Sequence, residues 1–197
     1  MFIQIIQGRC SREDEAKALF DRWRSELAPA AKGWLGGTFG FTDDGMLCSV
    51  VRFESKQAAD ANSARPEQGA WWAEMEKLYD GPVAFHDSDD VTLLMDGGSD
   101  QAGFVQIIQG KVGNAEMLRS MMVEDAEMLH EARPEILGGT LAIAEDGTFT
   151  ETIAFTDEDS ARKGEQMEMP AEVREQMERS MRDVKYMDLH HPWFASA

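Results

Sequence analysis

Positive charge is scarce in this sequence. Its 197 residues include 19 Lys and Arg against 37 Asp and Glu, which gives a formal net charge of −18 at pH 7. A surface this acidic repels nucleic-acid phosphates and anionic lipid head groups alike. We therefore expect neither nucleic acid nor a membrane as a partner.

Cysteine and long apolar segments are also scarce. The two cysteines, Cys10 and Cys48, are too few for a disulfide framework and stand in no CxxC motif, so we interpret both first as small apolar side chains. Met1 leads directly into a strand pattern, without a basic and apolar leader and without an apolar run of about 18 residues. These features predict a cytoplasmic protein.

Motifs for metals, phosphates and cofactors are missing as well. The stretches HDSDD at 86–90 and DLHHPW at 188–193 contain ligand types, but neither spaces three of them for one ion. A P-loop, a GxGxxG motif and a recognisable catalytic triad are also lacking. We expect neither a bound metal nor a cofactor.

What the sequence does contain is a long internal repeat. FIQIIQG at 2–8 returns as FVQIIQG at 104–110, and the same gapless shift aligns LGGT at 35–38 with LGGT at 137–140. Between the copies lies a stretch rich in Gly, Asp and Ser, whose composition suits a linker. We predict two homologous halves, residues 1–95 and 104–197, joined by a linker at 96–103.

Periodicity predicts the same order of elements in both halves. A strand is followed by a helix with Ser11 as its N-cap, then by two strands joined at Asp44-Gly45, a second helix and a fourth strand. The order βαββαβ is the ferredoxin-like unit. In the second half the helices are expected near 114–132 and 170–182, with Pro170 at the first helical position. A short extra strand is expected at 91–95.

Alternation along the strands predicts two unlike faces for each sheet. If Ile3 and Ile5 point toward the helices, as Leu35 and Phe39 do, the opposite face is small and of mixed polarity. That face would hold Gln4, Gln106, Thr38, Thr140, Cys48 and Arg52. Because it has few Lys and Glu residues, we expect it to be buried. The two sheets would then face one another across a barrel, with the glutamines inside.

The duplicated strand, the paired LGGT segments and the Asp-Gly hairpins together resemble the dimeric α+β barrel superfamily. The likeness is to the branch of antibiotic biosynthesis monooxygenases, here in tandem, and it covers 2–95 and 104–194. It implies an α+β fold in which two ferredoxin-like halves form a pseudo-dimeric barrel within one chain, and in which 91–95 reaches across to the other half. Further homodimerisation stays open.

The same resemblance implies a small-molecule cavity between sheet and helices, used in some members for cofactor-free oxygenation of aromatic substrates. The stretch NSARPEQGAWW at 62–72 resembles the Asn and Trp positions that surround the substrate in such oxygenases. Asn62, Trp71 and Trp72 are carried over on that basis. Helical spacing alone would make at least one of these tryptophans a core residue.

The remaining candidates come from the residues themselves. Arg52 is the only cation on the mixed face and would suit a carboxylate or phenolate, the alternative being a buried ion pair. Gln4 and Gln106 would bond a ligand, each other or the backbone. His86 would act as a general base or lie solvated at the surface. Thr38 and Cys48 complete the predicted ligand-binding set.

Arg52 and His86 align with Ala154 and Asp188, so the halves have diverged and we expect the working pocket in the first half. Three functions remain open. The first is an oxygenase-like enzyme acting on an aromatic or quinone-type metabolite. The others are a non-catalytic module that binds a small molecule and an acidic scaffold that binds another protein.

Overall fold

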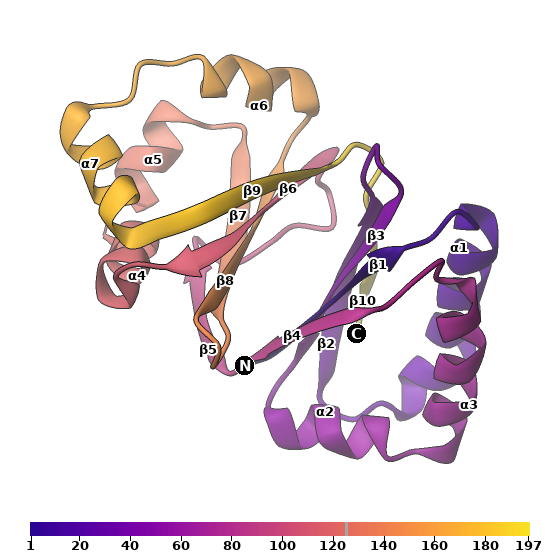
Figure 1. Ribbon diagram of the computed structural model, residues 1–197. Coiled ribbons are helices and arrows are strands. Elements are labelled where there is room, and N and C mark those ends of the chain that lie inside the picture. Colours follow the sequence, from indigo (N-terminus) through magenta and orange to yellow (C-terminus); the bar gives the residue numbers. More distant parts are fainter. Residues whose placement is uncertain (125) are drawn as a thin grey trace. The chain divides into compact units, whose positions relative to one another are not determined.

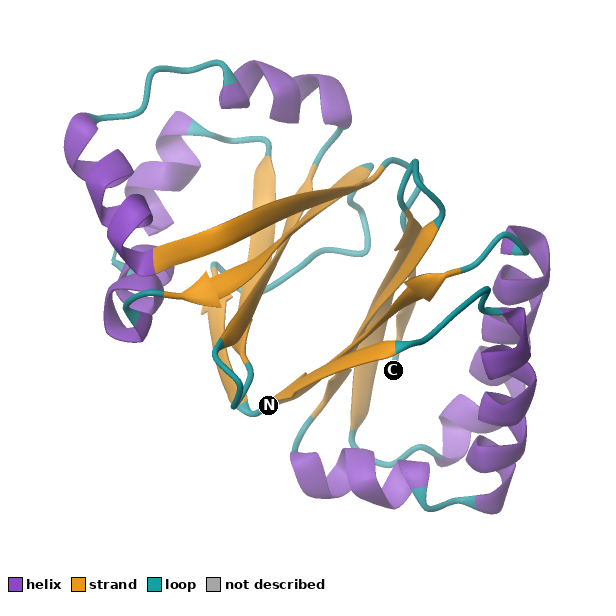
Figure 2. Ribbon diagram, in the orientation of Figure 1, coloured by secondary structure: helices purple, strands orange, loops and turns teal. Residues whose placement is uncertain are grey.

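The chain folds into two compact units (Figure 1). The computed structural model describes residues 1–124 and 126–197, the side chains of residues 127 and 128 excepted. Unit 1 comprises Met1–Asp89 and Trp193–Ala197, and unit 2 comprises Asp90–Pro192. Each unit is a five-stranded antiparallel sheet with its helices on one face, shown by colour in Figure 2.

Unit 1 has the strand order β10-β2-β3-β1-β4. Its strands are β1 (Phe2–Arg9), β2 (Trp34–Phe41), β3 (Met46–Phe53), β4 (Ala84–Ser88) and β10 (Trp193–Ser196). Its helices are α1 (Glu13–Arg22), α2 (Lys56–Ser63) and α3 (Pro66–Met75). A π-helical segment at Trp23–Leu27 extends α1, and short 3-10 turns follow at Ala28–Ala30 and Glu76–Leu78.

Unit 2 has the matching order β5-β7-β8-β6-β9. Its strands are β5 (Asp90–Leu94), β6 (Phe104–Val112), β7 (Ile136–Ile143), β8 (Thr148–Phe155) and β9 (Met181–Leu189). Its helices are α4 (Ala115–Val123), α5 (Ala126–Ala132), α6 (Glu158–Glu165) and α7 (Ala171–Ser180). The α+β class with two ferredoxin-like units is confirmed, and their closure into one barrel stays a prediction.

One edge strand of each sheet comes from the other half of the sequence. In the sequence, β5 comes directly after the strands and helices of the first half, but it pairs with β7 of the second half. The prediction that 91–95 extends to the other half is therefore confirmed. β10 follows the elements of unit 2 but pairs with β2. Its Trp193 stacks on Phe39 and Phe41 with ring centroids 5.8 Å from each. The exchange therefore brings an aromatic side chain into unit 1 from a distant part of the chain.

Several helices differ from the sequence prediction. α2 and α6 were missed because they are short and polar; each begins at a side-chain cap, Ser55 accepting from Ala58 N and Asp157 from Ser160 N. The single helix expected at 114–132 is divided into α4 and α5. Pro170 is the N-cap of α7 instead of its first residue.

The predicted cap of α1 was also wrong. Its N-cap is Arg12, and Ser11 donates from both its backbone N and its Oγ to the Asp80 carboxylate. The hydroxyl is therefore used to tie the start of α1 to the segment after α3.

The face of β1 was predicted wrongly. Residues directly opposite in an antiparallel pair share a face. Gln4 lies opposite Val51, which packs against the helix-side core, whereas Ile3 lies opposite Arg52. Gln4 therefore faces the helices, as does Gln106 opposite Ile153 in unit 2. Alternation could not decide this point because both faces of β1 carry aliphatic side chains.

A β-bulge displaces another predicted residue. The pairing of β2 with β3 jumps from Trp34↔Phe53 to Gly36↔Arg52, which leaves Leu35 as the extra residue. Gly36 takes a φ of 142°, a conformation that favours glycine. Trp34, and not Leu35, therefore joins the helix-side core.

The two cores differ in composition. In unit 1 the core residues include the aromatic side chains of Phe2, Trp23, Trp34, Phe39, Phe53, Trp71 and Tyr79. In unit 2 they include three phenylalanines and a larger aliphatic share, with Leu94, Leu118, Met122, Ile136, Leu141 and Ile153. One backbone plan therefore encloses two chemically different interiors.

Candidate functional site

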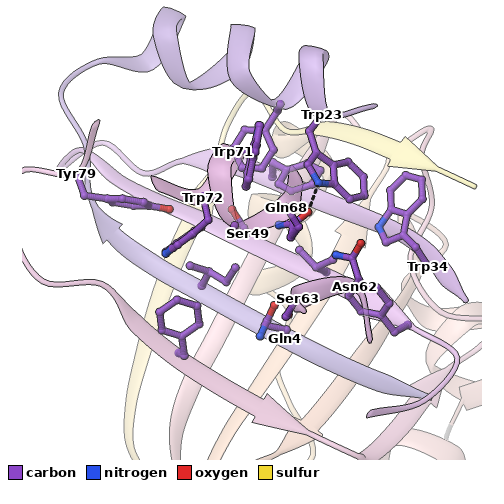
Figure 3. Close-up of a pocket in the computed structure, with 17 residues that line it drawn as sticks. Gln4, Trp23, Trp34, Ser49, Asn62, Ser63, Gln68, Trp71, Trp72 and Tyr79 are labelled. Carbon is purple, nitrogen blue, oxygen red and sulfur yellow. Dashed lines mark hydrogen bonds between the residues drawn. The ribbon is translucent and has the colours of Figure 1, made fainter. Parts of the chain in front are cut away.

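A pocket of about 280 Å³ lies between the sheet and the helices of unit 1 (Figure 3). Its walls are mainly aromatic and include Trp23, Trp34, Trp71, Trp72, Tyr79 and Phe85. Large flat side chains of this kind favour a planar apolar ligand. The cavity lies where the family resemblance implies one.

The floor of the pocket is a row of side chains that crosses four strands. Phe39, Ser49, Ile6 and Phe85 lie directly opposite one another on β2, β3, β1 and β4, and all four line the pocket. Ser49 is the polar member of this row. Its side chain therefore lies on the pocket side of the sheet, in the middle of the floor.

Two polar atoms in the lining are buried without a hydrogen-bond partner. They are Ser49 Oγ and Trp34 Nε1, whose residues are 1% and 6% exposed. A buried polar atom left unpaired costs about 1–3 kcal/mol. Because both atoms belong to residues that line the cavity, a ligand that accepts hydrogen bonds would recover this energy.

Asn62 adds a third polar group to the lining. It lies in the last turn of α2, is 6% exposed, and its Oδ1 accepts a hydrogen bond from Arg65 Nη1 at 3.0 Å. Arg65 also donates to the carbonyl of Leu27 at 3.1 Å, which holds it in place. With its oxygen engaged, Asn62 keeps its Nδ2 hydrogens for another acceptor.

The two predicted tryptophans have different roles. Trp71 is buried in the core, and its Nε1 donates to the carbonyl of Leu19 at 2.9 Å, so it fixes α3 against α1 while forming one wall. Trp72 is partly buried and meets Phe85 at a centroid distance of 5.5 Å. Trp23 is held by Gln68 Oε1 at 2.6 Å, the dashed line in Figure 3. Both tryptophans predicted to contact the ligand line the pocket.

No described residue that lines this pocket is Asp, Glu, Lys, Arg or His. Burial raises the pKa of Tyr79 far above its usual range, so its phenol stays neutral. The pocket borders one carboxyl indirectly: Gln4 lines it and donates from Nε2 to Asp87 Oδ2 at 3.3 Å. Burial also raises the pKa of Asp87, against the smaller opposing effect of that hydrogen bond.

Four predicted site residues lie on the opposite face of the sheet. They are Thr38, Cys48, Arg52 and His86, of which His86 lies opposite Ile5 on that face. Arg52 Nη1 donates to Thr38 Oγ1 at 3.1 Å, and burial raises the pKa of the Cys48 thiol to about 12. The expected burial of Thr38, Thr140 and Cys48 is confirmed. The structure thus brings Gln4, Asn62, Trp71 and Trp72 together and separates these four from them.

Ser49 and Trp34 were missed in the sequence. Ser49 carried a usable signal, because alternation with Leu47, Val51 and Phe53 places it on the apolar face of β3. A hydroxyl in that register is out of place in a core and indicates a cavity. Trp34 carried no such signal, since the bulge that turns it inward is not evident from the LGGT segment.

The corresponding region of unit 2 is strongly charged. Gln106 Nε2 donates to Glu165 at 3.1 Å and to Asp188 at 2.9 Å, and Arg162 pairs with Glu158, Glu165 and Asp188. Gln106 lies opposite Asp188 as Gln4 lies opposite Asp87. The sequence alignment of His86 with Asp188 was therefore wrong by one residue, because the chain from Gln106 to Asp188 is one residue shorter than the chain from Gln4 to Asp87.

Across the described ranges, the side chains form no group of three or more His, Cys, Asp or Glu residues that could hold a metal ion. In that same part of the chain, no helix combines the length and the apolar character needed to cross a membrane.

No family model matches the sequence, and no curated protein matches it either. Solved structures do match. A putative monooxygenase from Lactobacillus acidophilus NCFM superposes with a TM-score of 0.74 at 13% identity, over 99% of this chain and 95% of that one. An anthrone oxidase-like protein gives 0.72 at 10% identity, over 100% and 93%. The chain shares their fold.

A third structure connects this fold to the predicted family. It is an uncharacterised ferredoxin fold protein related to antibiotic biosynthesis monooxygenases, from Listeria monocytogenes 4b F2365, with a TM-score of 0.54 at 10% identity over 97% of this chain and 95% of that one. The resemblance to tandem proteins of this kind is confirmed as a likeness of fold. The roles of individual residues have to be argued from the pocket itself.

Proposed function

We propose that unit 1 binds a neutral, planar aromatic or quinone-type metabolite and oxygenates it without a cofactor. The observation that carries this proposal is the aromatic pocket with two unpartnered polar atoms, Ser49 Oγ and Trp34 Nε1. Its volume of about 280 Å³ is near the lower end for ligand pockets, which favours a molecule of two or three fused rings.

The positions of the two atoms favour oxygens at both ends of the ligand. Trp34 pairs with Phe53, and Ser49 lies four residues from Phe53 along β3, so their backbones are roughly 13 Å apart. A molecule with carbonyl groups on opposite edges would accept from both donors while its rings lie between the aromatic walls. Quinones and related ketones have this form.

The lack of charged side chains in the described lining favours a neutral ligand. Arg52, which was expected to hold an anion, lies on the other face of the sheet with Thr38. An anionic ligand would be desolvated in this pocket without a countercharge, which is costly. Neutral hydrogen-bond acceptors match the donors that are available.

The proposed reaction converts an activated methylene to a carbonyl: one CH₂ group and one O₂ give one C=O group and one water. Loss of a proton from the methylene places negative charge on a conjugated oxygen, which hydrogen bonds from Ser49 and Asn62 would stabilise. Asp87 is assigned as the base in place of His86, because its side chain is on the pocket face and is joined to the lining through Gln4.

Non-catalytic binding is the second candidate. It is favoured by the same uncharged lining, in which the described residues provide no direct acid or base at neutral pH. The two candidates share the ligand and differ in turnover.

The test uses 2-methyl-1,4-naphthoquinone for binding, followed by quenching of tryptophan fluorescence, and anthrone for oxygen consumption. Ser49→Ala and Trp34→Phe should each weaken quinone binding about fivefold to twentyfold, the loss of one hydrogen bond. Thr38→Val, on the opposite face, should change affinity less than twofold. Asp87→Asn should lower the rate of oxygen consumption more than it lowers affinity.

The outcomes separate the candidates. If the quinone binds in a way that depends on Ser49 but no oxygen is consumed, the non-catalytic binding module is the function that remains. If the protein neither binds the quinone nor consumes oxygen, both candidates are rejected and the acidic scaffold is favoured. Ser49→Ala should not destabilise the protein, because it removes a hydroxyl that has no partner, so a weaker affinity could not be attributed to unfolding.

A further inference from the structure

We infer that unit 2 holds a second ligand site of different chemistry, in which the carboxylate of Glu151 pairs with the ammonium group of an amphipathic amine. This site is independent of the function proposed for unit 1.

Glu151 occupies the place that Ser49 has in unit 1. It lies opposite Leu141 on β7 and Ile108 on β6, and Ile108 lies opposite Tyr186 on β9. In unit 2 the corresponding row is Leu141, Glu151, Ile108 and Tyr186. Its counterpart in unit 1 is the pocket floor, where Phe39, Ser49, Ile6 and Phe85 all line the cavity. A carboxyl group therefore projects from the middle of the sheet toward the helices.

The surroundings of Glu151 are apolar. Leu141 is fully buried and Ile108 packs against the same core. Among the described residues, no ion pair or hydrogen bond engages the carboxyl, and burial alone raises its pKa to about 7. An ionised carboxylate in such a place is costly unless a cation accompanies it. The residue is nevertheless only partly buried, so the group is accessible to a ligand.

A cavity of about 650 Å³ adjoins this row. It is lined by Tyr186 from the row itself, by Gln106 and Asp188 from the next row, and by apolar side chains that include Leu129 of α5, Val173 of α7 and Met169. Glu151 lies two strands from Tyr186, about 10 Å between backbones. A ligand with its apolar body in the cavity and its head group along the row would reach the carboxylate.

The charges around the cavity favour a cation. Both guanidinium groups in the lining are already paired: Arg133 with Glu135, and Arg162 with three carboxylates. Glu168 adds another carboxylate to the lining. The exposed ring of Tyr186 offers a face for a cation, and the adaptable Met169 suits an apolar body.

An organic ammonium fits this arrangement better than a metal ion. Hard divalent cations need six or more oxygen ligands, or several carboxylates converging on one point. Glu151 stands alone among hydrocarbon side chains, and the described residues form no metal-binding group. A single carboxylate beside an apolar cavity is the complement of an amine with an aromatic or aliphatic body.

The test compares two probes of the same shape on the full chain, 2-phenylethylammonium chloride and 2-phenylethanol, by isothermal titration calorimetry at pH 8. The wild-type protein should bind the ammonium probe at least tenfold more tightly than the alcohol. Glu151→Gln, which keeps the shape and removes the charge, should abolish that difference. Glu151→Ser, which introduces the residue of unit 1, should abolish it as well and guards against a folding defect in the first variant.

Two controls complete the design. Glu168→Gln removes a carboxylate from the same cavity and should change ammonium affinity less than threefold. Ser49→Ala, in unit 1, should leave it unchanged, which separates this site from the quinone pocket. The inference is overturned if the wild-type protein does not distinguish the two probes, or if Glu151→Gln binds the ammonium as tightly as the wild type does.

Discussion

Unit 1 and unit 2 have the same strand order, the same bulge at the leucine before the first glycine of LGGT, and the same glutamine–aspartate contact, yet their interiors differ. In unit 1 the space between sheet and helices is aromatic and its described lining uncharged. In unit 2 it is aliphatic and bordered by an ion-pair network around Arg162. The backbone plan therefore does not determine what the interior can bind.

The difference between the units is concentrated at a few matched positions. Ser49 corresponds to Glu151 in the strand pairing, and at the 102-residue shift Trp71 and Asn62 correspond to Val173 and Gly164. Gly164 lets the Arg133 guanidinium approach so closely that an added Cβ would collide with it. An asparagine at this position would displace Arg133. The residues of each interior therefore depend on one another and cannot be exchanged singly between the units.

The largest expected effect tests the aromatic character of unit 1. Trp71→Ala removes a buried side chain and its hydrogen bond to Leu19, and should lower the free energy of unfolding by about 3–5 kcal/mol. Val173→Ala, at a partly exposed position on the corresponding helix α7, should cost about 1 kcal/mol. Urea denaturation measures both. Equal losses would show that the two interiors contribute alike, contrary to this comparison.

The next effect depends on pH and tests Glu151. Its pKa is raised from 4.5 to about 7 in the folded state, so folding favours the protonated form. Stability is then highest below the unfolded pKa and falls as pH rises from 4.5 to 7. Glu151→Gln removes this loss and should stabilise the protein by up to about 3 kcal/mol at pH 8 but not at pH 4.

The reciprocal variant sharpens the same comparison. Ser49→Glu introduces a carboxyl among the aromatic side chains of unit 1 and should lower the melting temperature at pH 8 more than at pH 4. If Glu151→Gln gives the same change at both pH values, the carboxyl is not desolvated in the folded state.

The smallest effect separates the two glutamines. Gln106 is buried and donates to two carboxylates, so Gln106→Ala should cost about 1–2 kcal/mol of unfolding free energy. Gln4 makes one longer hydrogen bond to the exposed Asp87, and Gln4→Ala should cost less than about 0.5 kcal/mol. Thermal denaturation under identical conditions ranks the two. A larger loss of unfolding free energy for Gln4→Ala than for Gln106→Ala would contradict this ranking.

Much of the architecture was predictable because it depends on repeated signals. The matching strands, the Asp-Gly hairpins and the helical spacing of large apolar residues each predict local structure, and together they gave the ferredoxin-like order. Asn62, Trp71 and Trp72 were placed at the pocket by family resemblance. Short polar helices such as α2 escaped because side-chain caps, and not apolar periodicity, mark them.

The parts that failed have physical reasons of their own. Gln4 was assigned to the wrong face because Ile3 and Ile6, on opposite sides of β1, are equally apolar. That error carried Arg52 into the predicted site, since it was thought to share a face with Gln4, whereas His86 was proposed only as the histidine of the first half. Trp34 needed knowledge of a bulge, and Glu151 needed the register between strands, neither of which alternation within one strand provides.

The exchanged strands also affect the order in which the protein can assemble during synthesis. β2 is made early, but its partner β10 is separated from it by more than 150 residues. A ribosome that has produced all other elements of unit 1 still leaves one edge of that sheet open until residue 196 emerges. The edge formed by β7 in unit 2 is not left open in this way, because its partner β5 has already been made when β7 is synthesised.

The open edge of β2 is therefore a transient hazard for the nascent chain. Unpaired strand edges promote association with other strands, and closing a loop of this length is entropically costly and slow. Until β10 docks, Trp193 is also missing from its place against Phe39 and Phe41. A slow codon or a bound chaperone that acts while β10 is being made would thus affect unit 1, although the residues being added follow unit 2.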